Sequence, residues 1–436
     1  MAAPAKSLRN VAVLTLGCKL NHADSDALAR RFAEAGCAVS EDPRNADAVV
    51  INSCTVTHVA DAKARQLVRR ARRLSPAATI VLTGCYVDSA GQRLSLDEAD
   101  LIIGNEGKPR VVDMVFRART GQPPAAEAAG ERPGLARLRT RAFVKIQEGC
   151  NDVCAFCIVP RVRGPENSRT IADVVLEARQ HEAAGVQELV LTGTQLGHYG
   201  RDKGWEPGPL KLLQALLRNT AVPRIRVSSL QAQDFSEQLL ELWQDPRLCP
   251  HFHVPLQSGS EHVLGRMRRR YDPKTYRSAI AMIRRTVPGA ALTTDVIAGF
   301  PGETDDDFEQ TLQLCRDMRF AAIHAFPYSI RRGTAAALMA DQVEQDIRDA
   351  RVNRLIALGR ESGRRFRETL VGTHQQVLWE ESRENTWIGL TPNYCRVRAV
   401  GRGAVNTIDN VRIDGVAGAL LTGVIEPRGR ALGLAS

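Results

Sequence analysis

The chain has 436 residues, of which 44% are hydrophobic and 25% are charged, a composition typical of soluble globular proteins. This length predicts two to four domains, and the short, charge-interrupted apolar runs exclude a membrane-spanning helix. The basic N-terminus leads straight into an apolar strand, so we expect no signal peptide, a cytoplasmic location and no membrane partner. A formal net charge of +10 favours a polyanionic partner.

The first 120 residues alternate short apolar runs with helical stretches. Strands are expected at 11–16, 47–52, 79–83 and 101–104, and helices at 23–35 and 60–74. Such alternation predicts a doubly wound, parallel α/β domain spanning residues 1–120.

Three cysteines stand at equivalent places in this pattern. Cys18, Cys54 and Cys85 each follow the end of a predicted strand. Because the carboxyl ends of parallel strands lie along one edge of the sheet, we expect the three thiols to form one metal site there. The alternative is that each is a small core hydrophobe.

A linker rich in Ala, Pro, Gly and Arg is expected at 121–140, followed by a central domain at 141–366. Six βα repeats predict a partial TIM-like (β/α)6 barrel, with its chemistry at the carboxyl ends of the strands. The expected strands are 143–147, 188–192, 225–230, 251–256, 292–298 and 323–328.

The loop after the first barrel strand has the spacing Cys150-x3-Cys154-x2-Cys157. This spacing lets three thiolates face one inorganic centre from a single loop. A zinc ion usually needs a fourth protein ligand, and no Cys or His follows within the usual few residues. A four-iron cluster with one open iron is therefore favoured over a zinc site or a reduced structural loop.

Other barrel loops carry polar and basic residues. Thr192-Gly193-Thr194-Gln195, Ser229 and Gln257 follow strand ends, where they are either ligand contacts or turn formers. The run Arg268-Arg269-Arg270 is either a guide for a phosphate backbone or a solvated helix face.

Residues 367–436 show short strands with Gly- and Asn-containing turns, which predict a small β-barrel. This part has eight arginines against seven acidic residues and is therefore barely basic. Cys37, Cys249, Cys315 and Cys395 fit no metal-binding pattern and are read as core or neutral residues.

The cysteine motifs together resemble the radical S-adenosylmethionine (SAM) methylthiotransferases. The resemblance rests on Thr15-Leu-Gly-Cys-Lys-Leu-Asn21, Asn52-Ser-Cys-Thr-Val56, Thr83-Gly-Cys85 and the loop Gly149–Pro160. It implies two [4Fe-4S] clusters: a catalytic SAM cluster on Cys150, Cys154 and Cys157, and an auxiliary cluster on Cys18, Cys54 and Cys85. It also implies that the last domain is a TRAM-like RNA-binding module.

The resemblance further implies the cofactor contacts. SAM would contact a set of residues near the central cysteine loop: Phe156, Thr192, Gly193, Gln195, Ser229 and Gln257. The family pattern has Asn near 195 and Glu near 231, and this chain has Gln at both positions.

Within the family, the opening Cys18-Lys-Leu-Asn21 most resembles the branch acting on tRNA N6-threonylcarbamoyladenosine. The implied reaction adds a methylthio group to C2 of that base beside the anticodon. It consumes two SAM molecules, an electron from a flavodoxin- or ferredoxin-like reductant, and sulfur from an unidentified source. Lys19 is the candidate for the carboxylate of the substrate, and Arg268, Arg269 and Arg270 are the candidates for tRNA.

Three alternatives stay open. The first is a methylthiotransferase that acts on isopentenyladenosine in tRNA, and the second is a methylthiotransferase that acts on a ribosomal protein side chain. The third is a non-catalytic iron–sulfur protein that binds RNA. Release of 5′-deoxyadenosine separates the last alternative from the enzymes.

Overall fold

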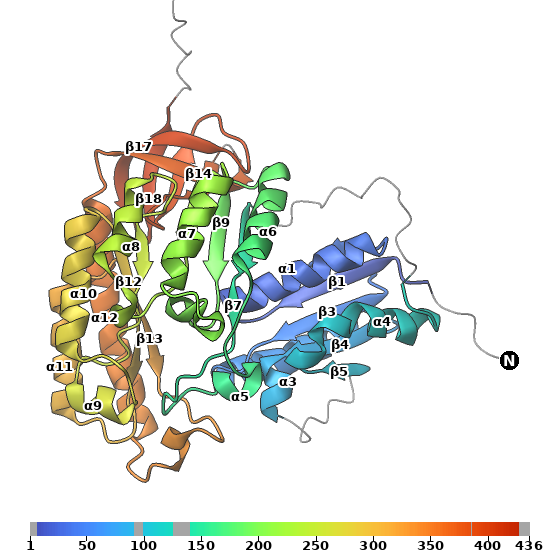
Figure 1. Cartoon of the computed structure of the whole chain (residues 1–436), viewed down its shortest axis with the longest axis horizontal. Helices are drawn as coiled ribbons and strands as arrows, with labels where there is room; N and C mark the ends of the chain where they lie inside the picture. The colour runs from blue at the N-terminus through green and yellow to red at the C-terminus, as the bar shows by residue number, and fades with distance from the viewer. Residues whose placement is uncertain (1–6, 91–98, 125–139, 385, 427–436) are drawn as a thin grey trace, which may run out of the picture.

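The computed structural model describes residues 7–90, 99–124, 140–384 and 386–426. A five-stranded α/β unit, an open barrel of six parallel strands and a small closed β-barrel follow one another along the chain (Figure 1). Within the described ranges, no helix is long and apolar enough to cross a membrane. Most of the linker expected at 121–140 lies outside the described residues.

The first unit, here called the N-terminal unit, is a parallel sheet covered on both faces by helices. Its strands are β1 (Asn10–Thr15), β2 (Ala38–Ser40), β3 (Ala48–Ser53), β4 (Thr79–Gly84) and β5 (Leu101–Ile103), and its helices are α1 (Lys19–Glu34), α2 (His58–Leu74), α3 (Cys85–Ala90) and α4 (Val111–Thr120). The strand order is β2-β1-β3-β4-β5, with parallel pairing throughout. This confirms the predicted doubly wound fold.

Alternate residues of the central strands enter two separate cores. Val11 and Val13 pack with α1 and α4, whereas Ala12 packs with α2 on the opposite face. Because both faces are covered, the strands are continuous apolar runs, which is why the sequence reveals them. Strand β2 was not predicted, because it is a three-residue edge strand without a buried residue.

The central barrel consists of two parallel sheets, and helices cover its outer side (Figure 1). Its strands are β6 (Arg141–Lys145), β9 (Glu188–Thr192), β10 (Arg224–Val227), β11 (His251–His253), β12 (Ala291–Ala298) and β13 (Ala322–Pro327). Its helices are α5 (Val159–Arg163), α6 (Ile171–Ala183), α7 (Gly208–Asn219), α8 (Glu237–Glu241), α9 (Glu261–Arg266), α10 (Pro273–Thr286), α11 (Asp305–Met318) and α12 (Gln345–Glu368). A short hairpin of β7 (Gln147–Glu148) and β8 (Asn167–Ser168) accompanies them.

The sheets have the orders β10-β9-β6 and β11-β12-β13. The first strand of the barrel, β6, and its last strand, β13, each end a sheet and do not pair with one another. The barrel is therefore open, as the sequence predicted. Its apolar core lies between strands and helices and takes alternate strand residues such as Val144, Leu189 and Leu292. The intervening residues face the space that the strands enclose, which we call the lumen.

Helix α1 of the N-terminal unit covers the lumen side of two barrel strands. Ala23 packs against Phe143 of β6 and Val190 of β9, and the His22 ring stacks on Phe143 with centroids 5.5 Å apart. The beginning of α1, which directly follows Cys18, therefore lies against the barrel strands. This contact places the cysteines of the N-terminal unit next to the barrel loops.

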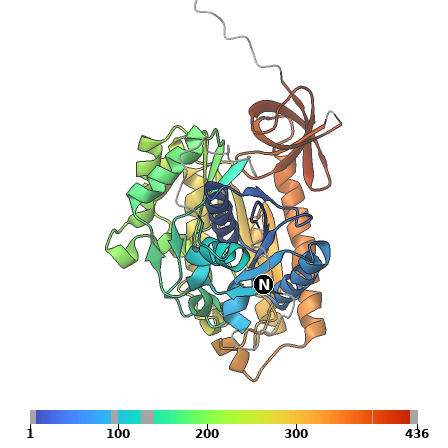
Figure 2. The ribbon, with the colours of Figure 1, turned by 90° about the vertical axis from the view of Figure 1, so that its right-hand side faces the viewer.

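The C-terminal unit is a closed barrel in the order β14-β15-β16-β18-β17, which confirms the predicted β-barrel. Its strands are β14 (His374–Arg383), β15 (Thr386–Leu390), β16 (Arg396–Val400), β17 (Ile408–Ala417) and β18 (Leu420–Ile425). Figure 2 shows it at one end of α12. Trp379 is fully buried and its indole N–H donates to Asp409 at 2.8 Å, so Trp379 belongs to the core of this barrel.

A buried ion pair joins the C-terminal unit to the central barrel. Glu188 is fully buried and accepts two hydrogen bonds from Arg226, at 2.8 and 3.0 Å. The Arg226 guanidinium also donates to the backbone carbonyl of Pro392, and Arg224 donates to that of Leu390. The negative charge of Glu188 thus balances the arginines whose hydrogen bonds hold the backbone of the C-terminal unit.

The Glu188→Gln substitution tests this arrangement. Arg226 would keep a buried charge without its counter-ion, and we expect the free energy of unfolding to fall by about 3–5 kcal/mol. The matched control is Glu237→Gln, which breaks an exposed 2.8 Å pair with Arg285 and should cost about 0–1 kcal/mol. Urea unfolding measures both; equal losses in the two variants would contradict the role given to Glu188.

Candidate functional site

The three cysteines of the N-terminal unit lie together at the carboxyl edge of its sheet, as predicted. Cys18 precedes α1, Cys54 follows β3 and Cys85 begins α3 directly after β4. The pKa of the Cys54 thiol is raised to about 11 by burial, and the neighbouring Cys18 and Cys85 raise it further. Three thiols on three adjacent strands thus share one electrostatic environment.

The loops that carry these cysteines pack tightly. Gly17 has φ +110°, and a Cβ atom there would lie 2.8 Å from the Cys54 sulfur. The Asn21 amide donates to the carbonyls of Leu16 and Ser53, at 2.7 and 2.9 Å. Asn21 thereby ties the loop after β1 to the loop after β3, and its side-chain oxygen lies 4.0 Å from the Cys18 sulfur.

The central cysteine loop lies at the carboxyl ends of the barrel strands. It begins at Gly149 and is anchored by two backbone hydrogen bonds, from Ala155 to Met267 and from Ala336 to Ala155. Burial raises the pKa of Cys157 to about 12, and the adjacent Cys154 and Cys150 raise it further, whereas Arg269 lowers it. The three thiols therefore lie near one another.

Neither cysteine triad is arranged for a single metal ion. In each triad of the described structure, at least two of the sulfurs lie more than 4.8 Å apart. A tetrahedral zinc ion with bonds of about 2.3 Å would hold its sulfurs only about 3.8 Å apart. The wider spread of the sulfurs fits a multi-iron cluster.

The two triads are neighbours. Ile158, which follows Cys157, packs with Cys85 in one apolar cluster that also includes Val162. The Arg163 side chain donates from Nε to the Cys85 sulfur at 3.2 Å. A loop that carries one triad therefore contacts a cysteine of the other.

Arg163 belongs to a buried charge network that the sequence did not predict. The Asp24 carboxylate, 3% exposed, pairs with Lys108 and Lys145 at 2.6 Å and with Arg163 at 2.9 Å. Burial alone would raise the pKa of Asp24, but these three cations lower it well below its usual range. Arg163 also pairs with Glu148 at 2.5 Å. The network joins the N-terminal unit to the barrel beside Cys85.

The central triad has an arginine donor as well. Arg269 donates from one Nη to the Cys154 sulfur at 3.3 Å and from the other to the Gln231 side-chain oxygen at 2.8 Å. Arg269 is thus half-buried against the cysteine loop instead of lying at the surface with its neighbours. Arg268 and Arg270 are exposed, and Arg270 pairs with Asp152 at 2.6 Å.

The residues expected to contact SAM lie around the carboxyl end of the barrel. Phe156 packs with Met267, Phe300 and Tyr328 beneath the cysteine loop. The others occupy strand ends and turns near this loop: Thr192 (end of β9), Gly193, Gln195, Ser229 and Gln257. Their contact with SAM stays a prediction.

Two of these positions are unusual in ways that suit a ligand. The Gln195 side-chain nitrogen is buried and has no hydrogen-bond partner within the described structure. Gln257 adopts φ +64°, rare for a residue with a side chain, and its backbone bridges to β12 through Asp295 and Ile297.

Lys19 extends from the start of α1 into the lumen. Its ammonium lies 5.7 Å from the centre of the Tyr394 ring, and burial lowers the pKa of Lys19. Among the described residues it has no carboxylate partner at ion-pairing distance. An anionic ligand would supply the missing counter-charge.

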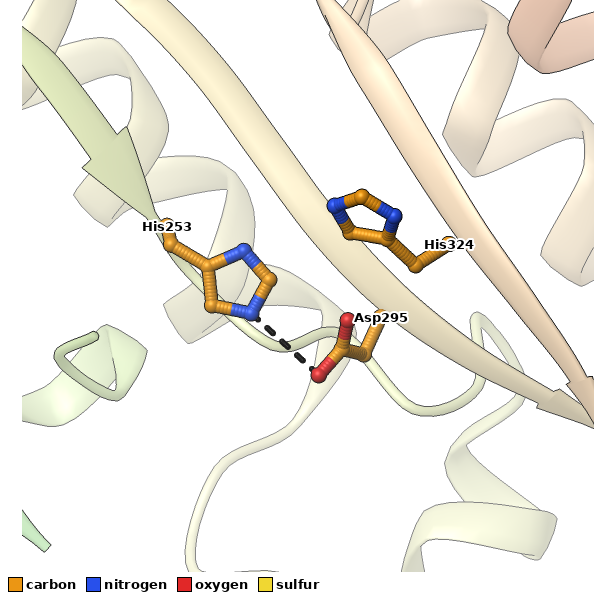
Figure 3. A group of neighbouring side chains, drawn as sticks. All are labelled: His253, Asp295 and His324. Atoms are coloured by element: carbon orange, nitrogen blue, oxygen red, sulfur yellow. Dashed lines mark ion pairs between the residues drawn. The ribbon is translucent and has the colours of Figure 1, made fainter. Parts of the chain in front are cut away.

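The lumen also holds a histidine–carboxylate group that the sequence reading missed. His253, Asp295 and His324 converge from three neighbouring strands (Figure 3). The available signal was a histidine or an aspartate inside each of three predicted strands. The four cysteines that fit no metal-binding pattern are all free thiols. Cys37, Cys249 and Cys315 are buried, and Cys395 is half-buried.

Comparisons with known proteins agree with this geometry. Residues 10–104 match the profile described as "Uncharacterized protein family UPF0004", and residues 144–315 match the radical SAM superfamily. Among solved structures, the radical SAM methyltransferase TsrM from Kitasatospora setae has a similar fold, with a TM-score of 0.56 over 85% of this chain and 81% of that chain at 14% identity.

Curated relatives are similar over nearly the whole chain. The threonylcarbamoyladenosine tRNA methylthiotransferase MtaB of Bacillus subtilis is 37% identical, over 89% of this chain and 90% of its own length. MtaB of Aquifex aeolicus is 34% identical, over 92% and 100%. The tRNA-2-methylthio-N(6)-dimethylallyladenosine synthase of Pelotomaculum thermopropionicum is 33% identical, over 86% and 88%. With two adjacent cysteine triads and these relatives, the chain belongs to the radical SAM methylthiotransferase family.

Proposed function

We propose that this enzyme adds a methylthio group to C2 of N6-threonylcarbamoyladenosine beside the anticodon of tRNA, using two [4Fe-4S] clusters and two SAM molecules. The observation that carries the proposal is the contact of Arg163 and Ile158 with Cys85, because it joins the segment that follows one cysteine triad to a cysteine of the other. The C2–H bond of adenine is neither acidic nor attached to a leaving group, so acid–base chemistry cannot functionalise it.

The two triads would hold the two clusters. Because each triad offers three cysteine ligands, one iron of each four-iron cluster would have no cysteine ligand. When bound, the central cluster with SAM at its open iron supplies the hydrogen-abstracting radical, and the auxiliary cluster supplies the sulfur. The chain would position both clusters and supply charge beside them, since Arg163 and Arg269 each donate a hydrogen bond to a cysteine sulfur.

The threonylcarbamoyl substrate is favoured by the polarity of the lumen beside Cys18. This substituent carries a carboxylate, and Lys19 is a buried ammonium group without an ionic partner among the described residues. An isopentenyl group is apolar and would leave that ammonium uncompensated. The two MtaB relatives support the same substrate, whereas the Pelotomaculum relative supports the isopentenyl alternative.

The remaining assignments follow from a tRNA substrate. Arg268 and Arg270 are exposed near the cysteine loop and would contact its phosphates, together with the TRAM-like barrel. The reaction needs a flavodoxin- or ferredoxin-like electron donor and a sulfur source. We place the enzyme in the cytoplasm, where tRNA is modified.

Gly149 offers a test of the central cluster. Its φ is +74°, and an added Cβ would lie 1.8 Å from the carbonyl oxygen of Pro165, so Gly149→Ala must displace the chain at Cys150. We expect this variant to lose about half of the iron reconstituted in the wild type and to stop cleaving SAM. Gly289→Ala is the control, because Gly289 has φ +75° with no atom within 4 Å of the added Cβ. Iron analysis and visible absorbance decide; full iron in Gly149→Ala would refute the assignment.

A triple Cys→Ala change at 18, 54 and 85 tests the division of roles. We expect about half of the iron, continued reductive cleavage of SAM, and no methylthio transfer. Chromatography of 5′-deoxyadenosine and of the tRNA nucleosides measures the two activities separately. Equal loss of SAM cleavage in this variant and in the triple variant at 150, 154 and 157 would argue against two roles.

The substrate is tested with two hypomodified tRNAs, one carrying threonylcarbamoyladenosine and one carrying isopentenyladenosine. We expect methylthiolated product from the first, and a reduction of at least about tenfold in kcat/KM for Lys19→Met because a charge-assisted contact is lost. Mass spectrometry of the nucleosides identifies the product. Product from the isopentenyl tRNA alone would refute the substrate while leaving the family unchanged.

A further inference from the structure

The group formed by His253, Asp295 and His324 lies in the lumen, apart from both cysteine triads. One ligand atom of each residue lies within 4.8 Å of the other two. Asp295 and His324 are paired positions on β12 and β13, and His253 lies on β11, next to β12. Figure 3 shows the two imidazoles and the carboxylate pointing toward one another.

We propose that His253, Asp295 and His324 form a binding site for a divalent cation of the zinc class. Two imidazoles and one carboxylate are the protein ligands of many metal sites that keep an open coordination position. The three side chains come from three adjacent strands of one sheet, so the ligand set is held by rigid elements. The open position would face the lumen and take an oxygen ligand.

The hydrogen bonds around His253 suit a ligand. Its Nδ1 lies 3.0 Å from the Thr293 hydroxyl, and its Nε2 lies 3.2 Å from the Asp295 carboxylate. If Nδ1–H donates to Thr293, Nε2 keeps its lone pair and points toward Asp295. The Thr293 hydroxyl can then donate to Nε2 of His251, 3.2 Å away. A metal-bound histidine usually has its other ring nitrogen fixed in this way.

The charges are compatible with a cation. Within the described structure, the Asp295 carboxylate lies 3.2 Å from His253 Nε2 and forms no ion pair with a lysine or an arginine. A divalent ion would be bound by this carboxylate and by the lone pairs of two neutral imidazoles.

Two arginines near the group have carboxylate partners of their own. Arg226 is neutralised by Glu188 at 2.8 Å, and Arg141 by Glu380 at 2.9 Å. Lys19 also raises the potential at the group, and it has no carboxylate partner at ion-pairing distance among the described residues. The site therefore has one uncompensated carboxylate facing two imidazoles, which a divalent ion would bind together.

Zinc binding to the enzyme with both clusters reconstituted tests the proposal without tRNA, so its outcome does not depend on the proposed reaction. After incubation with micromolar Zn²⁺ and desalting, we expect elemental mass spectrometry to find one zinc ion per wild-type chain. Asp295→Asn and His324→Gln should each weaken binding by more than 100-fold, and Thr293→Val by about 10–100-fold. Retained iron in every variant shows that the chain is folded.

The matched control is His262→Ala. His262 pairs with Asp307 at 3.1 Å, like His253 with Asp295, but it is exposed and has no third ligand. Zinc binding should be unchanged in this variant, and X-ray absorption should show only nitrogen and oxygen ligands. Absence of zinc from the wild type, equal zinc in the Asp295 and His324 variants, or sulfur ligands at about 2.3 Å would each overturn the proposal.

Discussion

The position of the N-terminal unit on the barrel depends on one buried carboxylate. Asp24 sits on α1 and binds Lys108 of its own unit together with Lys145 and Arg163 of the barrel. A buried charge of either sign is costly unless it is paired, so the four groups hold one another in place. Because Arg163 also reaches the Cys85 sulfur, the same network sets how the two cysteine triads face each other.

Helix α1 couples this network to the lumen. Its first residue, Lys19, follows Cys18 and enters the barrel, and its Ala23 packs on β6 and β9. The open side of the barrel is thus lined by the unit that carries the second triad. A substrate base in the lumen would meet both triads and, on the far strands, the histidine–carboxylate group.

The C-terminal unit is held by a second buried charge, Glu188, through arginines that bind carbonyls of that unit. Tyr394 of this unit stacks on His251 of β11, with centroids 4.7 Å apart, and also faces Lys19. Residues from all three units therefore meet in the lumen. The TRAM-like barrel contributes to the surroundings of the proposed site as well as to the proposed binding of RNA.

The sequence by itself determined the fold of the three units and nearly all of their strands, because continuous and alternating apolar runs are local patterns. It also singled out the six cysteines, by their place after strands and by the spacing of the central loop. Tertiary structure alone decided the rest. Arg269 turns from a surface run toward Cys154, Asp24 meets three distant cations, and His253 and His324 meet Asp295 across a sheet. These contacts join residues tens to more than a hundred positions apart, and a charged side chain carries no local signal of whether it will be solvated or buried with a partner. For Asp24, the packing of α1 on the open barrel decides this, because it removes water from the carboxylate and from its three partners.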